Sequence, residues 1–352
     1  MAQSEIPAGS PNHKSPPGVS EAFDSRAALG YLGPMKLSRR QFLGSATLAG
    51  AAGIARPAQA MPMRTLGRTG VQVSILGFGC GSRFMMYKQE EKAIAALQRA
   101  LELGITYVDT ASSYGNGRSE EWVGKALQGR KDVFLVTKVN RRKADEAMRV
   151  IETSLKKLGR NPDLIHIHAL ADAQDLAAIE AEDGVLKLLY KLREQKVCRF
   201  IGVTCHADPT VLKTALERHD FDCTQMALNA AMVSMSEGQG PGYKPERQPG
   251  ASFEELVLPV ALRKKMGVTA MKVFAQDKLT GQAPAEMLIR YAMSLPVAAA
   301  VIGMPQLEHL EANARLAQNF QPLTRRQMRE LSAKLSGQRA VLEHYFRRHQ
   351  DA

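Results

Sequence analysis

The chain has 352 residues, of which 47 are Lys or Arg and 35 are Asp or Glu, so its formal net charge is +12 at pH 7. This length suffices for one large core or for two ordinary domains. The positive charge fits a phosphate-bearing ligand or a solvated basic surface equally well, but no nucleic-acid-binding motif accompanies it. The four cysteines show no Cys-x-x-Cys spacing, which argues against an iron–sulfur cluster or a zinc knuckle. We therefore expect no nucleic-acid partner.

The first 60 residues do not have the pattern of a folded domain. Residues 1–34 are rich in Pro, Gly, Ser and Ala and lack a sustained period, which predicts a disordered leader. Residues 35–60 read MKLSRRQFLGSATLAGAAGIARPAQA, with two adjacent arginines, a mildly apolar segment and small residues at the end. This order is typical of a twin-arginine signal peptide, and an amphipathic helix that carries two arginines is the plain alternative. The apolar segment is too short and too rich in Gly and Ala to be a stable membrane anchor.

The signal predicts where the protein works. The twin-arginine export machinery would carry it to the periplasm, with Met35 as a candidate start and Met61 near the start of the exported chain. This route carries proteins that have already folded, often around a cofactor. Because the cysteines indicate no metal cluster, we expect an organic cofactor, bound by a domain that spans residues 61–352.

From Met63 onward, short apolar runs alternate with stretches of helical spacing. A hairpin over residues 64–74 comes first, with its turn between Gly67 and Gly70. Eight apolar runs follow, at 74–81, 106–111, 133–138, 164–169, 200–205, 223–229, 267–274 and 297–303. Runs such as 133–136 are apolar on both faces, as strands buried in a parallel sheet are.

Eight such units in about 250 residues predict an α/β fold, namely a (β/α)8 TIM barrel with a core of about 64–317. A short N-terminal β-hairpin precedes the barrel, and a C-terminal helix over 323–348 follows it. A capping box from Thr324 to Gln327 marks the start of that helix. A doubly wound sheet is the alternative, but the nearest phosphate-binding turn, at 77–82, lacks its third glycine and opens no helix.

In a barrel of this kind, functional residues gather at the C-terminal ends of the strands. Those ends carry Asp109 and Tyr114 after the second run, Lys138 in the third and His168 in the fourth. Because the strands are neighbours, we expect these four side chains to face one another across the barrel mouth. Asp109 with Lys138 alone is also compatible with a structural ion pair.

The four side chains suit proton transfer at a carbonyl or an alcohol. A free tyrosine has a pKa of about 10, and a nearby lysine ammonium lowers that pKa because it favours the phenolate. A carboxylate beside the lysine keeps it charged, and a histidine can orient a carbonyl or hydroxyl through one ring nitrogen. The other half of such a reaction is transfer of a hydride.

Six sequence motifs come in a recognisable order over about 64–317. They read RTLGRTGVQVSILGFG, GITYVDTASSYGNGRSEEWVGKAL, VTKV, PDLIHIH, IGVTCH and EHLEANARLA. With these motifs the chain resembles the aldo-keto reductase superfamily. The resemblance implies an NAD(P)H-dependent oxidoreductase that interconverts a small aldehyde or ketone with its alcohol. It also implies that Tyr114 is the general acid, assisted by Lys138, Asp109 and His168.

The resemblance also implies the residues that bind the cofactor. Thr204, Cys205 and Gln225 would hold the nicotinamide amide, and Met271 falls where an aromatic residue often stacks on the nicotinamide. Lys272, Gly303 and Asn313 would complete the cofactor site. Gly303 and His309 stand where the family commonly has cations for the 2′-phosphate, so both NADP(H) and NAD(H) are candidate cofactors.

Two other functions remain open. His166 lies two residues before His168, and a His-x-His strand is also found in metal-dependent hydrolases, which need a further ligand such as His206. The interpretation of His166 as a core residue predicts no metal site. A non-catalytic nucleotide-binding subunit that senses redox state is the third possibility. Residues 231–252, rich in Gly, Pro and Ser, would shape the pocket or form a surface excursion.

Overall fold

The computed structural model describes residues 60–235, 252–339 and 341–342. The predicted leader and signal peptide, most of the stretch 231–252 and the end of the C-terminal extension lie outside these residues. The predictions for those segments therefore stay predictions. Among the described residues, no helix has both the length and the apolar composition needed to cross a membrane.

Eight parallel strands close into a barrel, which confirms the predicted (β/α)8 fold. They are β3 (Leu76–Gly79), β4 (Tyr107–Asp109), β5 (Phe134–Val139), β6 (Leu164–Ile167), β7 (Phe200–Cys205), β8 (Cys223–Ala227), β9 (Gly267–Met271) and β10 (Ala299–Ile302). Each strand overlaps one of the eight apolar runs. The pairing of β10 with β3 closes the barrel, so the C-terminal ends of all the strands meet at one rim.

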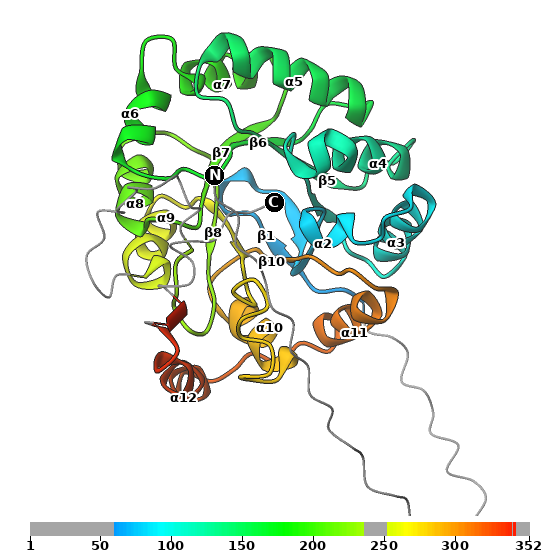
Figure 1. Ribbon diagram of the computed structural model, residues 1–352, viewed down its shortest axis with the longest axis vertical. Helices are drawn as coiled ribbons and strands as arrows, with labels where there is room; N and C mark the ends of the chain where they lie inside the picture. The colour runs from blue at the N-terminus through cyan, green and yellow to red at the C-terminus, as the bar shows by residue number, and fades with distance from the viewer. Residues whose placement is uncertain (1–59, 236–251, 340, 343–352) are drawn as a thin grey trace, which may run out of the picture. The chain divides into compact units, whose positions relative to one another are not determined.

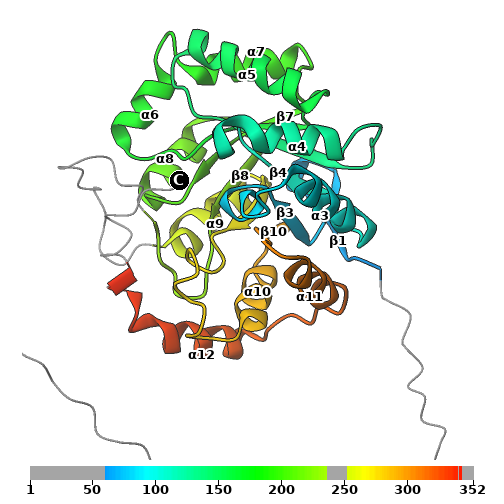
Figure 2. The same ribbon diagram turned by 45° about the vertical axis from the view of Figure 1, so that its right-hand side comes forward.

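Helices surround the strands (Figures 1 and 2). They are α3 (Glu90–Glu102), α4 (Arg118–Ala126), α5 (Ala144–Leu158), α6 (Ala173–Glu180), α7 (Val185–Glu194), α8 (Pro209–Arg218), α9 (Leu258–Arg263), α10 (Ala285–Ser294) and α11 (Leu307–Gln318). Short helical turns at the rim are α2 (Ser82–Met85), η2 (Tyr114–Gly117) and η3 (Phe253–Val257). Two of these, α2 and η2, follow strands directly and supply residues to the site described below.

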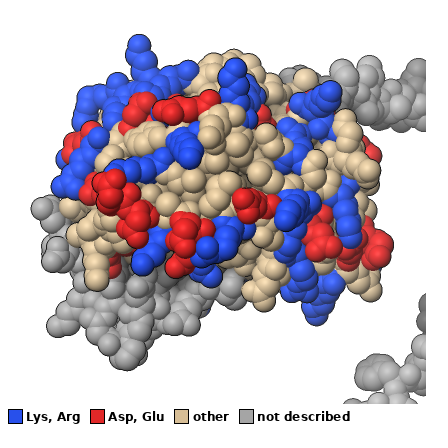
Figure 3. All heavy atoms as spheres, turned by 90° about the horizontal axis from the view of Figure 1, so that it is seen from above, with Lys and Arg blue, Asp and Glu red and all other residues tan. Residues whose placement is uncertain are grey.

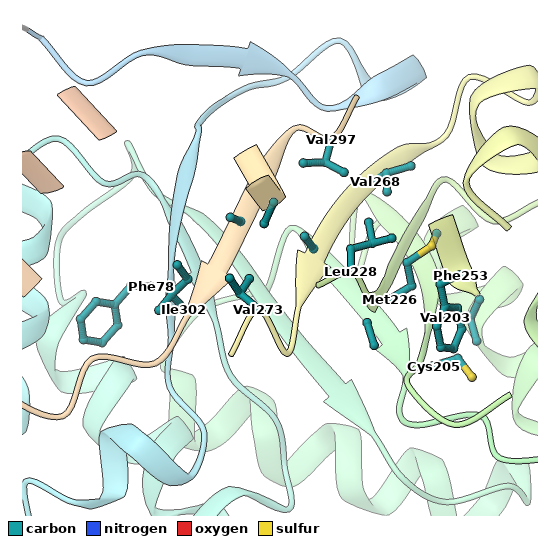
Figure 4. Packing of buried hydrophobic residues seen from close by; sticks show 14 of the residues in the cluster. Phe78, Val203, Cys205, Met226, Leu228, Phe253, Val268, Val273, Val297 and Ile302 are labelled. Carbon is teal, nitrogen blue, oxygen red and sulfur yellow. The ribbon is translucent and has the colours of Figure 1, made fainter. Parts of the chain in front are cut away.

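Apolar side chains fill two layers because successive strand residues point to opposite faces. One layer lies between the strands and the helices and contains Phe78, Met226 and Ile302, which are labelled in Figure 4. The other layer fills the barrel interior near the N-terminal ends of the strands, where the Tyr107 and Phe134 rings stack with centroids 5.6 Å apart. The barrel interior is therefore a packed core, and chemistry is confined to its mouth.

An N-terminal hairpin of β1 (Met63–Thr65) and β2 (Gln72–Ser74) joins the barrel at the opposite end. Its Leu66 is fully buried in the interior cluster. The turn lies against the chain before β9, because a Cβ atom on Gly67 would come within 2.3 Å of the Met266 backbone. The hairpin thus closes the end of the barrel that carries no rim residues.

The C-terminal helix α12 (Arg325–Ser336) begins with the capping box predicted at Thr324 and Gln327. It packs on α10, where the Ser332 hydroxyl lies 3.2 Å from the Tyr291 hydroxyl. On the face of the described part seen in Figure 3, basic and acidic side chains are interspersed. This mixture of charges is typical of a surface in contact with water.

Truncation of Leu66, the hairpin residue that fills the closed end of the barrel, tests the role of the hairpin. Leu66→Ala removes buried methyl groups, so it should lower the free energy of unfolding by about 2–5 kcal/mol. Urea unfolding followed by circular dichroism measures this change. Leu262→Ala, at a position 41% exposed on α9, is the matched control and should change it by less than about 1 kcal/mol. An equal effect of both substitutions on the free energy of unfolding would contradict the role of Leu66 in closing the barrel.

Candidate active site

The loop after β4 brings Tyr114 back over the barrel mouth. Asp109 is the last residue of β4, and η2 begins at Tyr114. Gly115 and Gly117 have φ angles of 57° and 84°, which glycine adopts without the cost that other residues incur. The ring of Tyr114 lies next to Gly81, where an added Cβ would be 3.5 Å from it. This tight turn accounts for the glycines on both sides of Asn116 in the motif.

Lys138 is the centre of a buried polar group. Its ammonium nitrogen lies 2.5 Å from Asp109 Oδ1, 2.9 Å from the Thr110 carbonyl oxygen and 3.3 Å from the Tyr114 hydroxyl. On the other side, the Gln225 amide donates to Asp109 Oδ2 at 3.2 Å. The side chains of Lys138 and Asp109 are only 1% and 5% exposed. The strands β4, β5 and β8 therefore meet in one hydrogen-bonded cluster.

Burial and charge act against each other in this cluster. Burial raises the pKa of Asp109, while the Lys138 ammonium and the Gln225 amide lower it in part. Burial alone would lower the pKa of Lys138, but Asp109 and Tyr114 more than reverse this, so the pKa of Lys138 lies above its ordinary value. Lys138 is consequently an ammonium at neutral pH, and its positive charge stabilises negative charge on the Tyr114 oxygen.

His168 directly follows β6 and stands edge-on to Tyr114, with ring centroids 5.5 Å apart and an interplanar angle of 81°. Its Nδ1 lies 3.4 Å from the Ser113 hydroxyl. Burial lowers the pKa of His168 well below its ordinary value, and the Lys138 charge lowers it further. The ring is therefore a neutral imidazole, which can donate a hydrogen bond from one nitrogen and accept one at the other.

The structure thus brings together the four residues predicted to be catalytic, together with Gln225. Sequence reasoning did not identify Ser113 and Thr110, which contact His168 and Lys138. Ser113 had a detectable signal, since it stands next to the predicted tyrosine. Thr110 contributes only its backbone carbonyl, and such a contact has no signature in residue type.

Thr204 and Cys205 both bond to the loop that follows His168. The Thr204 hydroxyl accepts a hydrogen bond from the Ala169 N–H at 2.8 Å, and the Cys205 thiol donates to the Leu170 carbonyl at 2.9 Å. Cys205 belongs to the hydrophobic layer between strands and helices, and it is labelled in Figure 4. Burial raises the pKa of its thiol to about 12, so the thiol remains a hydrogen-bond donor. The predicted contact of these two residues with a nicotinamide amide stays a prediction.

A cavity of about 490 Å³ opens beyond the ends of β9 and β10. Its lining includes the predicted residues Lys272, Gly303 and Asn313, together with His309. Met271 ends β9 directly before Lys272. The volume lies within the range of about 300–1,000 Å³ that is common for small-molecule sites.

The cavity has features that suit the phosphates of a dinucleotide. Helix α11 starts at its wall, and the N-cap residue Gln306 makes no side-chain capping bond to the first backbone N–H groups. Such a helix end favours anions. A Cβ atom on Gly303 would come within 2.7 Å of Arg83 Cβ, so glycine is required for this close approach. Arg83 forms an ion pair with Asp277, which joins two walls of the cavity.

His166 lies on β6, next to Lys138 of β5 in the register of the two strands. It is fully buried, and the absence of a side chain on Gly202 makes room for it, since a Cβ there would lie 2.4 Å from His166 Nδ1. His206 Nδ1 contacts the Met235 carbonyl oxygen at 2.6 Å. Among the residues that the structure describes, no group of three His, Cys, Asp or Glu side chains is placed to hold a metal ion.

The fold and the rim define a (β/α)8 barrel with a buried Lys–Asp pair beneath a tyrosine hydroxyl. Residues 76–276 match the model of the aldo/keto reductase family. The chain therefore belongs to the aldo/keto reductase family.

Characterised relatives match parts of the chain. L-galactose dehydrogenase of Arabidopsis thaliana is 33% identical over 155 residues, 40% of this chain and 48% of that protein. The aldo-keto reductase YhdN of Bacillus subtilis is 31% identical over 238 residues, 63% of this chain and 65% of that protein. In both cases the chain spans less than two thirds of the length of the relative.

Solved structures share the fold. The holo form of an aldo-keto reductase from Bacillus halodurans has a TM-score of 0.61 at 24% identity, over 77% of this chain and 96% of that one. An aldo-keto reductase from Klebsiella pneumoniae in complex with NADPH has a TM-score of 0.57 at 21% identity, over 80% of this chain and 96% of that one.

The low pKa of His168 gives a test that needs no substrate. An ordinary histidine changes charge near pH 6.5, whereas His168 should remain neutral as the pH passes through that value, because its pKa is lowered. Nitrogen-15 NMR of the imidazole groups measures this, with the His168→Gln variant assigning the signal. A His168 signal that titrates near pH 6.5 would contradict the electrostatics described here.

Proposed function

We propose that this protein is an NAD(P)H-dependent oxidoreductase that interconverts an aldehyde or ketone with its alcohol. The observation that carries the proposal is the position of the Lys138 ammonium, 3.3 Å from the Tyr114 hydroxyl and 2.5 Å from Asp109. A tyrosine alone is a poor proton donor at neutral pH, and this arrangement corrects that weakness. Membership of the aldo/keto reductase family supports the same reaction.

Each side chain has one task in the proposed reduction. Tyr114 donates its proton to the carbonyl oxygen, and Lys138 stabilises the phenolate that remains. Asp109 holds Lys138 charged and in place. His168, as a neutral imidazole, donates a hydrogen bond to the same oxygen and orients the carbonyl beside Tyr114. A reduced nicotinamide, when bound, would supply the hydride for the carbonyl carbon. Tyr114 regains its proton from solvent.

The cavity beside α11 is the proposed position of the nucleotide phosphates. Lys272 and the helix N-terminus supply positive potential there. Gly303 allows Arg83 to pack closely against the cavity wall. The complex of the Klebsiella pneumoniae structure with NADPH supports a nicotinamide cofactor. Both NADP(H) and NAD(H) fit this proposal, because Gly303 and His309 offer no permanent cation for a 2′-phosphate.

Relatives suggest the class of substrate. One is named L-galactose dehydrogenase, and another, 36% identical over 122 residues that cover 42% of it, is named methylglyoxal reductase YeaE and comes from Escherichia coli. A sugar and a short aldehyde share only a carbonyl–alcohol centre in a small molecule. We therefore propose a small carbonyl or alcohol substrate for this chain.

We also propose that the protein is exported to the periplasm through the twin-arginine machinery. The motif at Arg39 and Arg40 supports this, as do the small residues that end at Ala60. These residues lie outside the part of the chain that the structure describes.

Removal of the tyrosine hydroxyl tests the reaction. Tyr114→Phe should lower the rate of carbonyl reduction by about 10²–10⁴-fold, which is the usual worth of acid–base assistance. The affinity for the nucleotide should change little, because the substitution leaves the cavity beside α11 intact. Absorbance of the reduced nicotinamide measures the rate, and fluorescence titration measures nucleotide binding.

Tyr190→Phe on α7 is the matched control, since it removes a tyrosine hydroxyl that accepts a hydrogen bond from the Asp220 N–H and contributes nothing to the site. It should reduce carbonyls at the rate of the wild type. A Tyr114→Phe enzyme within a few-fold of wild type would exclude Tyr114 as the general acid.

Replacement of both signal arginines tests export. Arg39→Lys combined with Arg40→Lys should leave the uncleaved precursor in the cytoplasm, because the machinery recognises the arginine pair. Cell fractionation with N-terminal sequencing measures this, and Arg56→Lys, which leaves the arginine pair intact, is the charge-conserving control. Periplasmic protein that starts near Met61 in the double variant would refute the signal.

A further inference from the structure

The loop that follows His168 has a strained backbone. Ala169 has a φ angle of 51°, a left-handed conformation that residues other than glycine rarely adopt. Such conformations persist only where the surrounding structure enforces them, and they concentrate at functional sites. The contacts that hold Ala169 also determine where the His168 side chain points.

Every backbone polar group from the His168 N–H to the Ala171 N–H has a partner. The His168 N–H donates to the Val139 carbonyl at 2.9 Å, and the Leu170 N–H donates to the Thr204 carbonyl at 2.8 Å. All the others bond to side chains. The Ala169 N–H donates to the Thr204 hydroxyl at 2.8 Å, and the Ala171 N–H donates to the Asp175 carboxylate at 3.0 Å. The Leu170 carbonyl accepts from the Cys205 thiol at 2.9 Å, and the His168 and Ala169 carbonyls accept from Arg142 at 2.9 and 3.2 Å. Side chains therefore hold five of these seven backbone groups.

Arg142 occupies the central place in this network. It lies between β5 and α5, and its Nη2 binds both the His168 and the Ala169 carbonyl oxygens. Asp175, in the first turn of α6, accepts from Arg142 Nε at 2.6 Å and from Nη2 at 2.7 Å. The two side chains are 21% and 15% exposed. Two parallel bonds of this kind fix the orientation of a guanidinium as well as its position.

We propose that Arg142, oriented by Asp175, is a positioning residue that sets the place of the His168 imidazole beside Tyr114. The proposal rests on the proposed function, since it concerns the residue that orients the substrate carbonyl. Thr204 and Cys205 take part by fixing the Ala169 and Leu170 backbone. Arg142 bonds to Asp175 and to the His168 and Ala169 carbonyls, so it positions His168 through the backbone. Its charge also lowers the pKa of His168 directly, and Arg142→Lys keeps that charge.

The consequence follows from the geometry of the site. His168 and Tyr114 must reach the same carbonyl oxygen, and their rings lie edge-on with centroids 5.5 Å apart. A displacement of about 1 Å in such a site can cost about 10²-fold in rate. A residue that only stabilises the fold would change the amount of folded protein and leave the rate constant of that protein unaltered.

The Arg142→Lys substitution keeps the positive charge but removes the planar guanidinium. An ammonium cannot bind Asp175 and two carbonyls in one plane. Arg142→Lys should therefore lower the single-turnover rate of hydride transfer by about 10- to 100-fold. The Kd for the nucleotide should stay within about two-fold, since Arg142 does not line the cavity beside α11. The His168 imidazole signals in nitrogen-15 NMR should shift in position.

Arg149→Lys on α5 is the matched control. Its side chain is 67% exposed and forms a surface ion pair with Asp145, so all three measurements should equal those of the wild type. Asp175→Asn tests the same network from the other side and serves if Arg142→Lys does not fold. It should reproduce the rate loss and the NMR shift in the same direction.

An Arg142→Lys or Asp175→Asn protein with a wild-type rate constant and unmoved His168 signals would overturn the proposal. The NMR measurement also separates this failure from failure of the proposed function. If wild type reduces no carbonyl with either nucleotide, the proposed function fails, yet a shifted His168 signal still supports the positioning role. If Tyr114→Phe is inactive while Arg142→Lys is unaffected in every measurement, the function stands and the positioning role falls.

Discussion

The buried ion pair between Lys138 and Asp109 is the constraint on which the barrel mouth depends. Moving two charges out of water is costly, and their attraction offsets that cost only when geometry is good and further hydrogen bonds are made. The Thr110 carbonyl and the Gln225 amide supply those bonds. The strands β4, β5 and β8 must therefore keep a fixed register, and the closed barrel imposes it. The same charge lowers the pKa of His168 and favours negative charge on the Tyr114 oxygen.

Much of this arrangement was accessible from the sequence because it depends on periodicity and on strand order. Apolar runs located each strand, and polar residues at their ends located Asp109, Tyr114, Lys138 and His168. In a parallel barrel, neighbours along the chain are neighbours in space, so residues on consecutive strand ends must meet. The glycines around Asn116 indicated a tight turn, and the structure gives them positive φ angles.

The rest depends on contacts between segments that no local pattern connects. The side-chain contacts of Thr204 and Cys205 follow from the path of the loop after β6, which the sequence does not reveal. Arg142 is one of several basic residues in a short stretch, and only its distance to Asp175 distinguishes it. The ion pair of Arg83 with Asp277 joins residues that lie 194 positions apart in the sequence. Charge and residue type could suggest such partners, but only the fold selects them.

If the chain reaches the periplasm as proposed, the supply of reduced nucleotide becomes a constraint on the reaction. A charged dinucleotide does not cross a membrane freely, so an exported reductase must carry its nucleotide along or obtain it outside. The twin-arginine route permits the first solution, because it carries folded proteins. The ion pair between Arg83 and Asp277 joins two walls of the cavity proposed for the nucleotide. A nucleotide that stays bound must be reduced again in place, so one small molecule would be oxidised and a second reduced at the same rim. The single mouth of the barrel, with one tyrosine and one histidine, can serve both half-reactions because proton donation to a carbonyl and proton removal from an alcohol are the same step in opposite directions.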